Sequence, residues 1–449
     1  MSESDSNVAN FVFGGISILG LVTLSFLAGA YVSEFETFPY PQLLERPFKA
    51  LRAKTEKAQR DHSPKGSLWW DEVKHDKKGV TRYDESKAFD GFTVYSTHEP
   101  GAWLIDMEGN VIHEWRLPFF DAWPDPPHIN DPVDEEAIKW SGAKIFPNGD
   151  ALAIYTAEGD TPYGYGLAKV DKDSNVIWTY SDHVHHDFTV QPDGTIWTLT
   201  HQFRDLSTNP VPMMPDKFQG RRVLVDFAVH LSEDGEELER IRLTEAVFGS
   251  ELGEKVGKWH RGQRWDLLHT NNVEPIPQDF ARHHDFAEAG QLLVSFREIN
   301  TIALVDPESR KVTWYARGFW VKQHDPDPLS NGNILIYDNK GNRGPSGMSR
   351  VAEFDPRNGD IVWSYTGTAE DPFATKWGGK QKMLPNGNVL IAENRGSRVL
   401  EVNREGEVVW EFYVPQRAKQ EGKEYIPFIS GRTSRYRKDY FSFTPEANR

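Results

Sequence analysis

The sequence predicts an all-β protein, a six-bladed β-propeller preceded by one N-terminal transmembrane helix. A β-hairpin with an acidic or glycine turn and a bulky last residue occurs six times, as LIDMEGNVIHEW, KVDKDSNVIWTY, HLSEDGEELERI, LVDPESRKVTWY, EFDPRNGDIVWSY and EVNREGEVVWEF. Most of these hairpins follow a further turn and strand, as in PNGDALAIY, PDGTIWTL, SNGNILIYDN and PNGNVLIAEN. The helix is predicted by an uncharged segment near the N-terminus.

The turn residues explain why these segments should pair as antiparallel strands. Asn-Gly and Asp-Gly accept the positive φ angles of tight hairpin turns. Successive hairpins are roughly 45 to 75 residues apart, which is enough for four strands and their loops. One such sheet cannot bury both faces, so six would pack radially, with Trp and Tyr between neighbouring blades. We therefore expect one propeller over residues 89–412; a two-sheet sandwich or a pair of β domains is the alternative.

The N-terminal residues are expected to attach the propeller to a membrane. After a tail over residues 1–10, the segment 11–32 has no charged residue, and its length matches the ~20 residues that a helix needs to cross a bilayer. A cleaved signal peptide is the alternative, because Ala28-Gly29-Ala30 is typical of a cleavage site, although no Lys or Arg precedes the apolar segment. Residues 33–88 are expected to form a linker or stalk.

Indications of the side of the membrane conflict. Arg46, Lys49 and Arg52 follow the apolar segment, which favours a cytoplasmic propeller. Long domains, however, translocate largely regardless of flanking charge. We therefore expect a single-pass membrane protein whose propeller lies on the extracytoplasmic side, in the periplasm. Residues 413–449 contain the basic segment GRTSRYRKDYF and are expected either to complete a blade or to bind a membrane-protein partner.

Composition excludes several classes of protein. The net charge is −16, which argues against nucleic acid as a partner, because phosphate-backbone binding is driven by clustered cations. The chain contains no cysteine, so disulfides, thiolate metal sites and cysteine nucleophiles are excluded. Any nucleophile must therefore be another residue type.

Three His-Asp pairs precede strand-like segments, namely His186-Asp187, His284-Asp285 and His324-Asp325. If those segments are equivalent strands lining the channel, the histidines converge at one mouth of the propeller. Ser141 and Gly379 occupy the corresponding positions of two other blades, so the fold does not require histidine there. The alternative is that each pair closes a turn, with the Asp capping backbone N–H groups.

Three motifs in the second half of the propeller go beyond the repeat: WDLLHTNN from Trp265, SFR from Ser295, and QHD from Gln323 with the following SNGNILIYDN. In order, they resemble the Trp-x-His-x-Asn segment, the Ser-x-Arg strand and the Gln-His-Asp motif of the bacterial PAPS-independent arylsulfotransferases. With HHDFTVQPDG included, the resemblance spans most of residues 89–412.

The resemblance implies transfer of a sulfuryl group from an aryl sulfate donor to a phenolic acceptor by a ping-pong route, with no cofactor required. It implies that His324 is the nucleophile that becomes sulfated, and that His186, His269 and Arg297 hold the sulfate oxygens. These residue types suit the task, because neutral imidazole is a good nucleophile and Arg offers a planar fork of donors to an anion. Further histidines can stabilise charge or protonate the leaving phenolate.

Three further residues are candidates for substrate binding or for alternative roles. Asn271 and Asp325 belong to the matching motifs. His284 lies in an apparent insertion between His269 and Arg297 and could take the role of His269.

Two other functions remain open. His183, His185 and His186, together with His284 and His324, could bind a structural divalent transition-metal ion, with the aspartates of the His-Asp pairs orienting the imidazoles. Alternatively, the chain is a non-catalytic, membrane-tethered propeller that serves as a scaffold or accessory subunit of a membrane complex, because fold does not determine function.

Overall fold

The structure is a computed structural model that describes residues 69–215, 222–260, 265–342 and 347–443, together with Pro64 and Phe218. The predicted tail (1–10), the predicted transmembrane helix (11–32) and most of the predicted linker lie outside the described residues. Within the described ranges, no helix combines the length and the apolar composition needed to span a bilayer.

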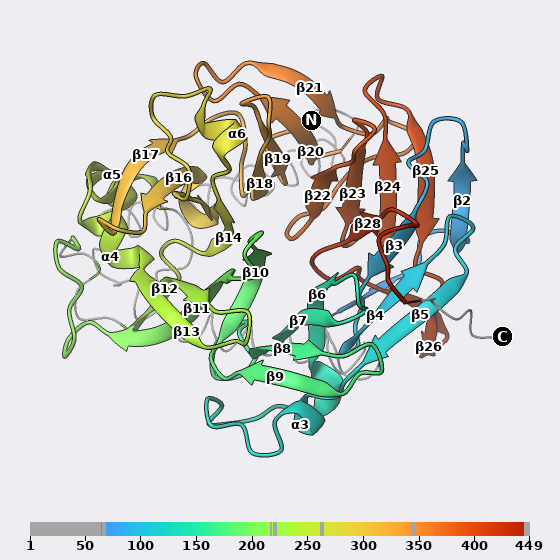
Figure 1. The fold of residues 1–449 in the computed structure, drawn as a ribbon, viewed down its shortest axis with the longest axis horizontal. Coiled ribbons are helices and arrows are strands. Elements are labelled where there is room, and N and C mark those ends of the chain that lie inside the picture. Colours follow the sequence, from blue (N-terminus) through green and yellow to red (C-terminus); the bar gives the residue numbers. More distant parts are fainter. Residues whose placement is uncertain are drawn as a thin grey trace, which may run out of the picture. The chain divides into compact units, whose positions relative to one another are not determined.

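Six antiparallel sheets of four or five strands surround a central axis (Figure 1). The first contains β28 (Ser434–Tyr436), β3 (Phe92–Tyr95), β4 (Gly101–Ile105) and β5 (Val111–Arg116). The second contains β6 (Lys139–Ile145), β7 (Ala151–Thr156), β8 (Gly166–Val170) and β9 (Val176–Tyr180). The third contains β10 (Val184–Val190), β11 (Ile196–Asp205), β12 (Arg222–Leu231) and β13 (Glu237–Arg242).

The remaining sheets continue the ring. The fourth contains β14 (Thr270–Pro275), β15 (Leu292–Phe296), β16 (Thr301–Asp306) and β17 (Lys311–Ala316). The fifth contains β18 (His324–Pro328), β19 (Ile334–Asp338), β20 (Arg350–Phe354) and β21 (Ile361–Tyr365). The sixth contains β22 (Lys380–Met383), β23 (Val389–Glu393), β24 (Arg398–Val402), β25 (Val408–Tyr413) and β2 (Gly79–Tyr83).

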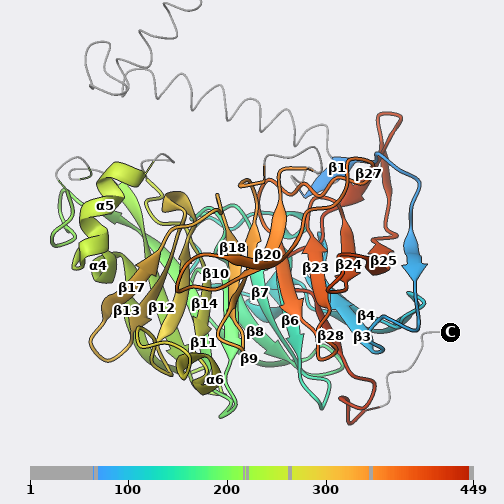
Figure 2. The ribbon, with the colours of Figure 1, turned by 90° about the horizontal axis from the view of Figure 1, so that it is seen from above.

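Short elements decorate this ring. A small separate sheet contains β1 (Trp70–Glu72), β27 (Lys423–Pro427) and β26 (Ala418–Gln420). The helices are α3 (Phe119–Ala122), α4 (Leu243–Phe248), α5 (Glu251–Trp259) and α6 (Gln278–Ala281), with 3₁₀ turns at Glu135–Ala137 and Arg297–Ile299. Figure 2 shows β1 and β27 on one face of the ring and α6 on the opposite face.

All six predicted hairpins are present, as the pairs β4–β5, β8–β9, β12–β13, β16–β17, β20–β21 and β24–β25. The four turn-and-strand segments ahead of them are also confirmed, because they join β6 to β7, β10 to β11, β18 to β19 and β22 to β23. Six separate sheets exclude the two-sheet sandwich. The architecture is that of a six-bladed propeller.

Tryptophans in the outer strands join neighbouring sheets. The indole Nε1 of Trp115 donates to the Gly149 carbonyl of the next sheet at 2.9 Å, and Trp410 donates to Met107 at 2.9 Å. Trp178 and Trp363 make the same contact to the sheets that follow them. The predicted aromatic packing between blades therefore includes a hydrogen bond from the indole of each of these four tryptophans.

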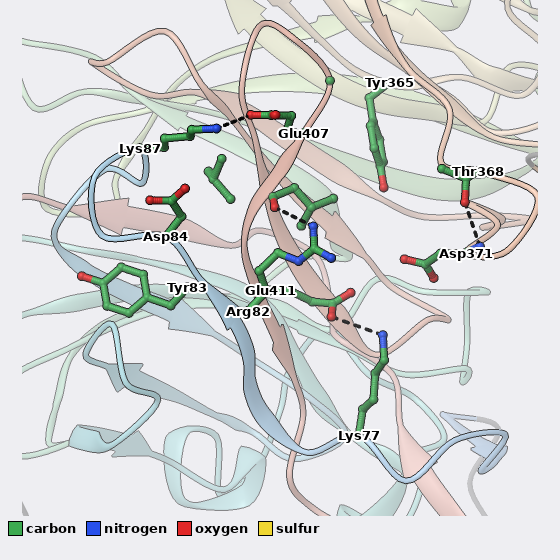
Figure 3. A pocket seen from close by; sticks show the side chains of 13 residues that line it. Lys77, Arg82, Tyr83, Asp84, Lys87, Tyr365, Thr368, Asp371, Glu407 and Glu411 are labelled. Carbon is green, nitrogen blue, oxygen red and sulfur yellow. Dashed lines mark hydrogen bonds and ion pairs between the residues drawn. The ribbon is translucent and has the colours of Figure 1, made fainter.

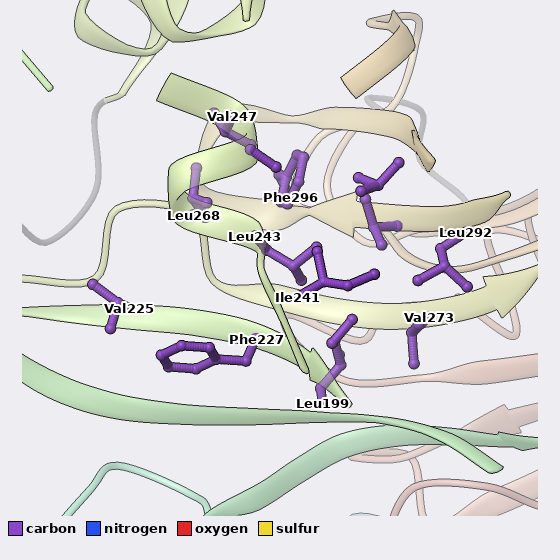
Figure 4. Packing of buried hydrophobic residues seen from close by; sticks show 14 of the residues in the cluster. Leu199, Val225, Phe227, Ile241, Leu243, Val247, Leu268, Val273, Leu292 and Phe296 are labelled. Atoms are coloured by element: carbon purple, nitrogen blue, oxygen red, sulfur yellow. The ribbon is translucent and has the colours of Figure 1, made fainter. Parts of the chain in front are cut away.

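Apolar side chains fill the space between sheets. Figure 4 shows Leu199, Phe227 and Ile241 of the third sheet facing Val273 and Phe296 of the fourth. Helix α4 covers the outer part of this cluster with Leu243 and Val247, both fully buried. Because each sheet is buried on both faces, the inner strands are held rigidly around the axis.

Both ends of the described chain take part in closing the ring. Strand β2 pairs with β25 at the outer edge of the sixth sheet, and β28 pairs with β3 in the first sheet. The predicted linker (33–88) thus contributes a propeller strand. Its sequence, GVTRY, is short and has a polar centre, so it did not indicate a strand. Arg435 of β28 and Glu401 of β24 form a fully buried ion pair that ties the first sheet to the sixth.

Candidate functional site

Four inner strands carry a β-bulge near the same end of the ring. The bulges lie between Trp140 and Ala143 in β6, His185 and Phe188 in β10, Thr270 and Val273 in β14, and His324 and Asp327 in β18. His186, His269 and Asp325 have positive φ angles of 59°, 52° and 50°. A non-glycine residue in this region costs about 1–3 kcal/mol, and such strain clusters at functional sites.

These bulges surround a cavity of about 280 Å³. Five residues predicted from the sequence line it together: His186, His269, Asn271, Arg297 and His324. The other lining residues that matter below are Trp69, Trp377 and Tyr163, which are aromatic, and Lys139, Gly378 and Lys380. The cavity therefore combines cations, imidazoles and aromatic walls, a composition suited to a small aromatic anion.

His324 is held in one tautomer. Its Nδ1 lies 2.7 Å from Asn339 Oδ1, while the amide nitrogen of Asn339 donates to the carbonyls of Thr375 (2.9 Å) and Gly378 (2.6 Å). Those two donations fix the orientation of the amide, so Asn339 Oδ1 must accept a hydrogen bond from the Nδ1–H of His324. The lone pair is then on Nε2, which receives only a long contact of 3.3 Å from the Gly378 N–H.

The same surroundings keep His324 neutral. Burial lowers the pKa of His324 well below its ordinary value, and the guanidinium of Arg297 lowers it further. A buried neutral imidazole with a free Nε2 lone pair is a nucleophile at neutral pH.

His269 is backed by a carboxylate and a phenol. Its Nδ1 lies 2.6 Å from Asp266 Oδ2 and 2.8 Å from the Tyr163 hydroxyl, which itself donates to Asp266 at 2.6 Å. Burial raises the pKa of Asp266, but the charge of His269 and hydrogen bonds from His269 and Tyr163 outweigh it and lower the pKa. An ionised Asp266 orients the ring so that Nε2 is left to exchange a proton with a ligand.

His186 stands against a second imidazole. Its Nδ1 lies 2.7 Å from His185 Nδ1, so one of the two nitrogens donates and the other accepts. Burial and the neighbouring His185 lower the pKa of His186 well below its ordinary value. His186 is therefore neutral, and it can offer a polarised N–H rather than a charge to a bound anion.

Two side chains offer unused polar groups near the anion position. Arg297 donates from Nη1 to Glu298 at 2.5 Å, but its Nε is buried without a partner among the described residues. Asn271 donates to the Gln323 carbonyl at 2.9 Å, and its Oδ1 is likewise buried without a partner in the described ranges. Buried polar groups left unpaired are costly, and a bound ligand is one way to satisfy them.

Lys139 places a further cation at the cavity. Its Nζ lies 3.7 Å from the centre of the Trp69 ring, within the range of a cation–π interaction. Burial lowers the pKa of Lys139 to about 7.

Asp325 has a structural position rather than a place on the cavity wall. Lys380 Nζ lies 2.6 Å from Asp325 and 2.9 Å from Asp187, and Arg432 reaches Asp187 at 3.1 Å. Burial alone would lower the pKa of Lys380, but the two carboxylates raise it above its ordinary value. This cluster, called here the axial ion cluster (Asp187, Asp325, Lys380 and Arg432), joins three inner parts of the ring.

His284 does not lie with the other histidines. Strand β14 begins directly after His269 in the chain and is followed by α6, which lies on the face of the ring opposite β1 and β27 (Figure 2), and His284 is not among the residues that line the cavity. His284 follows α6, stacks on Phe286 and lies 2.6 Å from the Gly332 carbonyl. The expectation that the three His-Asp pairs are equivalent is therefore wrong for His284, which precedes the second strand of its sheet. The metal set that included His284 and His324 is likewise not assembled.

Four residues of this site were not predicted from the sequence. Asp266 and Asn339 lie inside the motifs quoted above. Asp266 stands three residues before His269, and Asn339 directly follows the Tyr-Asp pair that ends β19. These positions were the available signals. Tyr163 and Lys139 come from the second sheet and its loops, far from those motifs in sequence. Nothing in the sequence signalled their approach.

A second hollow in the described part of the chain lies elsewhere. A pocket of about 580 Å³ lies beside the outer strands β2 and β25 (Figure 3). Its two lysines are paired, since Lys77 contacts Glu411 at 3.3 Å and Lys87 contacts Glu407 at 2.6 Å, while Arg82 donates to the Val408 carbonyl at 3.1 Å. No histidine is among its lining residues, so it offers less for catalysis than the central cavity.

Comparison with known proteins identifies one matching family. The sequence model described as arylsulfotransferase (ASST) matches residues 145–415, a range that includes His186, His269, Arg297 and His324. No curated protein matches the chain.

Several solved structures are similar at low identity. A protein of unknown function from Bacteroides caccae has 14% identity and a TM-score of 0.44, covering 78% of this chain and 100% of its own. A catalytically inactive virginiamycin B lyase from Staphylococcus aureus has 11% identity and a TM-score of 0.36, with 64% and 74% covered. Hydrazine synthase from Kuenenia stuttgartiensis has 12% identity and a TM-score of 0.38, with 74% and 79% covered. These TM-scores are too low to carry an inference about activity.

Proposed function

The chain belongs to the arylsulfotransferase family, and from this premise we propose that its central cavity transfers a sulfuryl group from an aryl sulfate to a phenolic acceptor. The transfer passes through a sulfated His324. The observation that carries the proposal is the fixed tautomer of His324, whose Nδ1 proton is held by Asn339 while Nε2 keeps its lone pair.

In the first half-reaction, Nε2 of His324 attacks sulfur, the N–S bond forms and the bond from sulfur to the aryl oxygen breaks. Arg297, His186 and the Gly378 N–H surround the position of the sulfate oxygens and stabilise the charge that builds up there. The aromatic walls formed by Trp69 and Trp377 suit the aryl group.

The leaving phenolate needs a proton, and the acceptor phenol must lose one. His269, oriented by Asp266, supplies that proton from Nε2 in the first half-reaction when it is protonated. It takes the proton of the acceptor in the second, when the acceptor oxygen attacks sulfur and His324 leaves. The proton count then balances over one turnover, and no cofactor takes part.

Attachment of the catalytic propeller to a membrane by residues 11–32, with the propeller on the extracytoplasmic side, is a further part of the proposal. It rests on the uncharged segment alone. Extraction of membranes at alkaline pH should leave the full chain in the pellet and release a variant that starts at Trp69.

The direct test is incubation of the full-length protein with 4-nitrophenyl sulfate, with and without a phenol. Expected results are sustained nitrophenol release only with the phenol present, and one sulfonated peptide that contains His324 when the phenol is omitted. Nitrophenol release that does not depend on acceptor would show hydrolysis instead. Absence of any release or adduct would favour the non-catalytic, scaffold role.

The lowered pKa of His324 predicts how sulfation depends on pH. An imidazole with an ordinary pKa near 6.5 would lose roughly 10-fold of its neutral form between pH 7 and pH 5.5. Because burial and Arg297 lower the pKa of His324, it stays neutral over that interval. The single-turnover rate of nitrophenol release should therefore change by no more than about 2-fold.

Nitrophenolate is a good leaving group, so this measurement depends little on proton donation by His269. Unfolding temperatures recorded at each pH separate loss of structure from loss of nucleophile. A 10-fold decline that follows an ordinary imidazole titration, with the fold intact, would contradict the arrangement described for His324.

A further inference from the structure

Beside the cavity, three buried side chains of the third sheet converge on one point. His185 lies in β10, His201 in β11 and Asp226 in β12. His201 and Asp226 are direct partners in the β11–β12 register, and His185 pairs with Leu199, two residues before His201. Their side chains therefore project from one face of the sheet. One nitrogen from each imidazole and one carboxylate oxygen all lie within 4.8 Å of one another.

One ring nitrogen of each imidazole has no partner among the described residues. His201 Nε2 lies 2.8 Å from the Thr161 hydroxyl, while its Nδ1 is buried without a partner among the described residues. His185 uses Nδ1 in the contact with His186, and its Nε2 is also buried without a partner in those ranges. A ring that donates from one nitrogen carries its lone pair on the other, which is the metal-binding form of histidine.

Asp226 supplies a negative charge that is not balanced by an ion pair. The Thr270 backbone N–H and hydroxyl both donate to Oδ2, at 3.0 and 2.6 Å, and leave Oδ1 for another ligand. No Lys or Arg of the described chain forms an ion pair with Asp226. An uncompensated buried carboxylate is costly unless it is protonated or meets a cation.

We propose that His185, His201 and Asp226 bind one divalent transition-metal ion, with Zn²⁺ as the probe ion. Two imidazoles and one carboxylate form a common ligand set for Zn²⁺ and related ions. The ion balances the charge of Asp226 and satisfies both unpartnered imidazole nitrogens. The set differs from the one predicted from the sequence, with only His185 in common.

Metal binding here would also set the tautomer of a cavity residue. With Nε2 of His185 on the metal, its proton is on Nδ1 and is donated to His186 Nδ1, so His186 presents an Nε2–H. This consequence rests on the proposed function of His186, whereas the metal site does not depend on sulfuryl transfer.

The test uses full-length protein stripped with EDTA, loaded with Zn²⁺, desalted and analysed for metal. One Zn²⁺ per chain is expected. Asp226→Asn and His201→Gln should each weaken Zn²⁺ affinity at least about 10-fold. The matched control is His183→Gln, since His183 lies near His201 but outside the ligand set, and it should retain the ion. Loading wild-type protein with Co²⁺ should produce a visible absorption band that Asp226→Asn lacks.

Three outcomes would overturn the proposal. Wild-type protein that retains no metal would show that the three side chains do not form a metal site. Equal retention by wild type and both ligand variants would place the ion elsewhere, as would its loss in His183→Gln. The metal-free unfolding temperature of each variant shows whether a loss of binding reflects misfolding, and the wild-type stoichiometry needs no variant. The metal content and the metal affinity do not depend on sulfotransferase activity, so the metal site and the proposed sulfuryl transfer can fail independently.

Discussion

Replacing His324 with alanine is expected to abolish both product formation and the sulfonated peptide, with a loss of about 10³-fold or more in acceptor-dependent turnover. The reason is that the oriented amide of Asn339 fixes the tautomer of His324 and leaves its Nε2 lone pair available. Among the cavity residues that the structure describes, only His324 has a buried nucleophilic lone pair held by an amide in this way. Removing it leaves Arg297 and His186 able to bind the sulfate but gives sulfur no group to attack it. The measurements are steady-state turnover and mass spectrometry of the trapped protein.

A matched control is His283→Ala. His283 is exposed, follows α6 and hydrogen-bonds to the Ser330 carbonyl at 3.1 Å, away from the central cavity, so turnover should stay within about 2-fold of wild type. Asn339→Leu is a milder variant, because it keeps the imidazole of His324 and removes the amide that fixes the tautomer of that ring. If nitrophenol release and a sulfonated peptide both persist in His324→Ala, then His186 or His269 is the nucleophile and the assignment is wrong.

The second large effect concerns stability. Replacing Lys380 with methionine in the axial ion cluster is expected to lower the free energy of unfolding by about 3–5 kcal/mol. Lys380 Nζ is buried between the carboxylates of Asp187 and Asp325. Its removal leaves two buried carboxylates close together, and the only ion pair that remains in the cluster is the one between Arg432 and Asp187. Urea unfolding followed by tryptophan fluorescence measures the change.

The comparison variant is Lys423→Met, which removes an ion pair to Glu72 in which both side chains are about half exposed. Surface pairs contribute about 0–1 kcal/mol, so this variant should unfold nearly as wild type does. Similar losses for the two variants would mean that the axial carboxylates relax toward solvent or protonate on removal of the lysine. The cluster would then not be the rigid support of the cavity described above.

Local chemistry explains which parts of the fold could be predicted. The hairpins depend on turn residues within a few positions of each strand, as at Gly332 with its φ of 86°, so each blade is visible in the sequence. Ring closure is harder to predict, because β2 and β28 pair with strands hundreds of residues away. The sequence did not predict β2, and completion of a blade by residues 413–449 was one of two alternatives. The pairing of Arg435 with Glu401 has no local signature.

The candidate site divides in the same way. His186, His269, Arg297 and His324 meet in one cavity because they occupy the same end of successive inner strands or the turns beside them. His284 was misplaced because counting back from a turn glycine cannot tell an inner strand from the second strand of its sheet. Tyr163 could not be predicted, because its contact with Asp266 joins two different sheets. The repeat predicts the order of these sheets around the axis, but it does not predict the distance between them.

The closure of the ring has a consequence for biosynthesis. The first sheet receives its strand β28 only after residue 436 has left the ribosome, although β3, β4 and β5 are among the earliest strands made. Until then, β3 has an open edge, and an open edge of a sheet is prone to pair with other chains. Nascent propellers would therefore be most vulnerable to aggregation and to chaperone capture late in translation. The last strand of the described chain covers this edge and ends that interval.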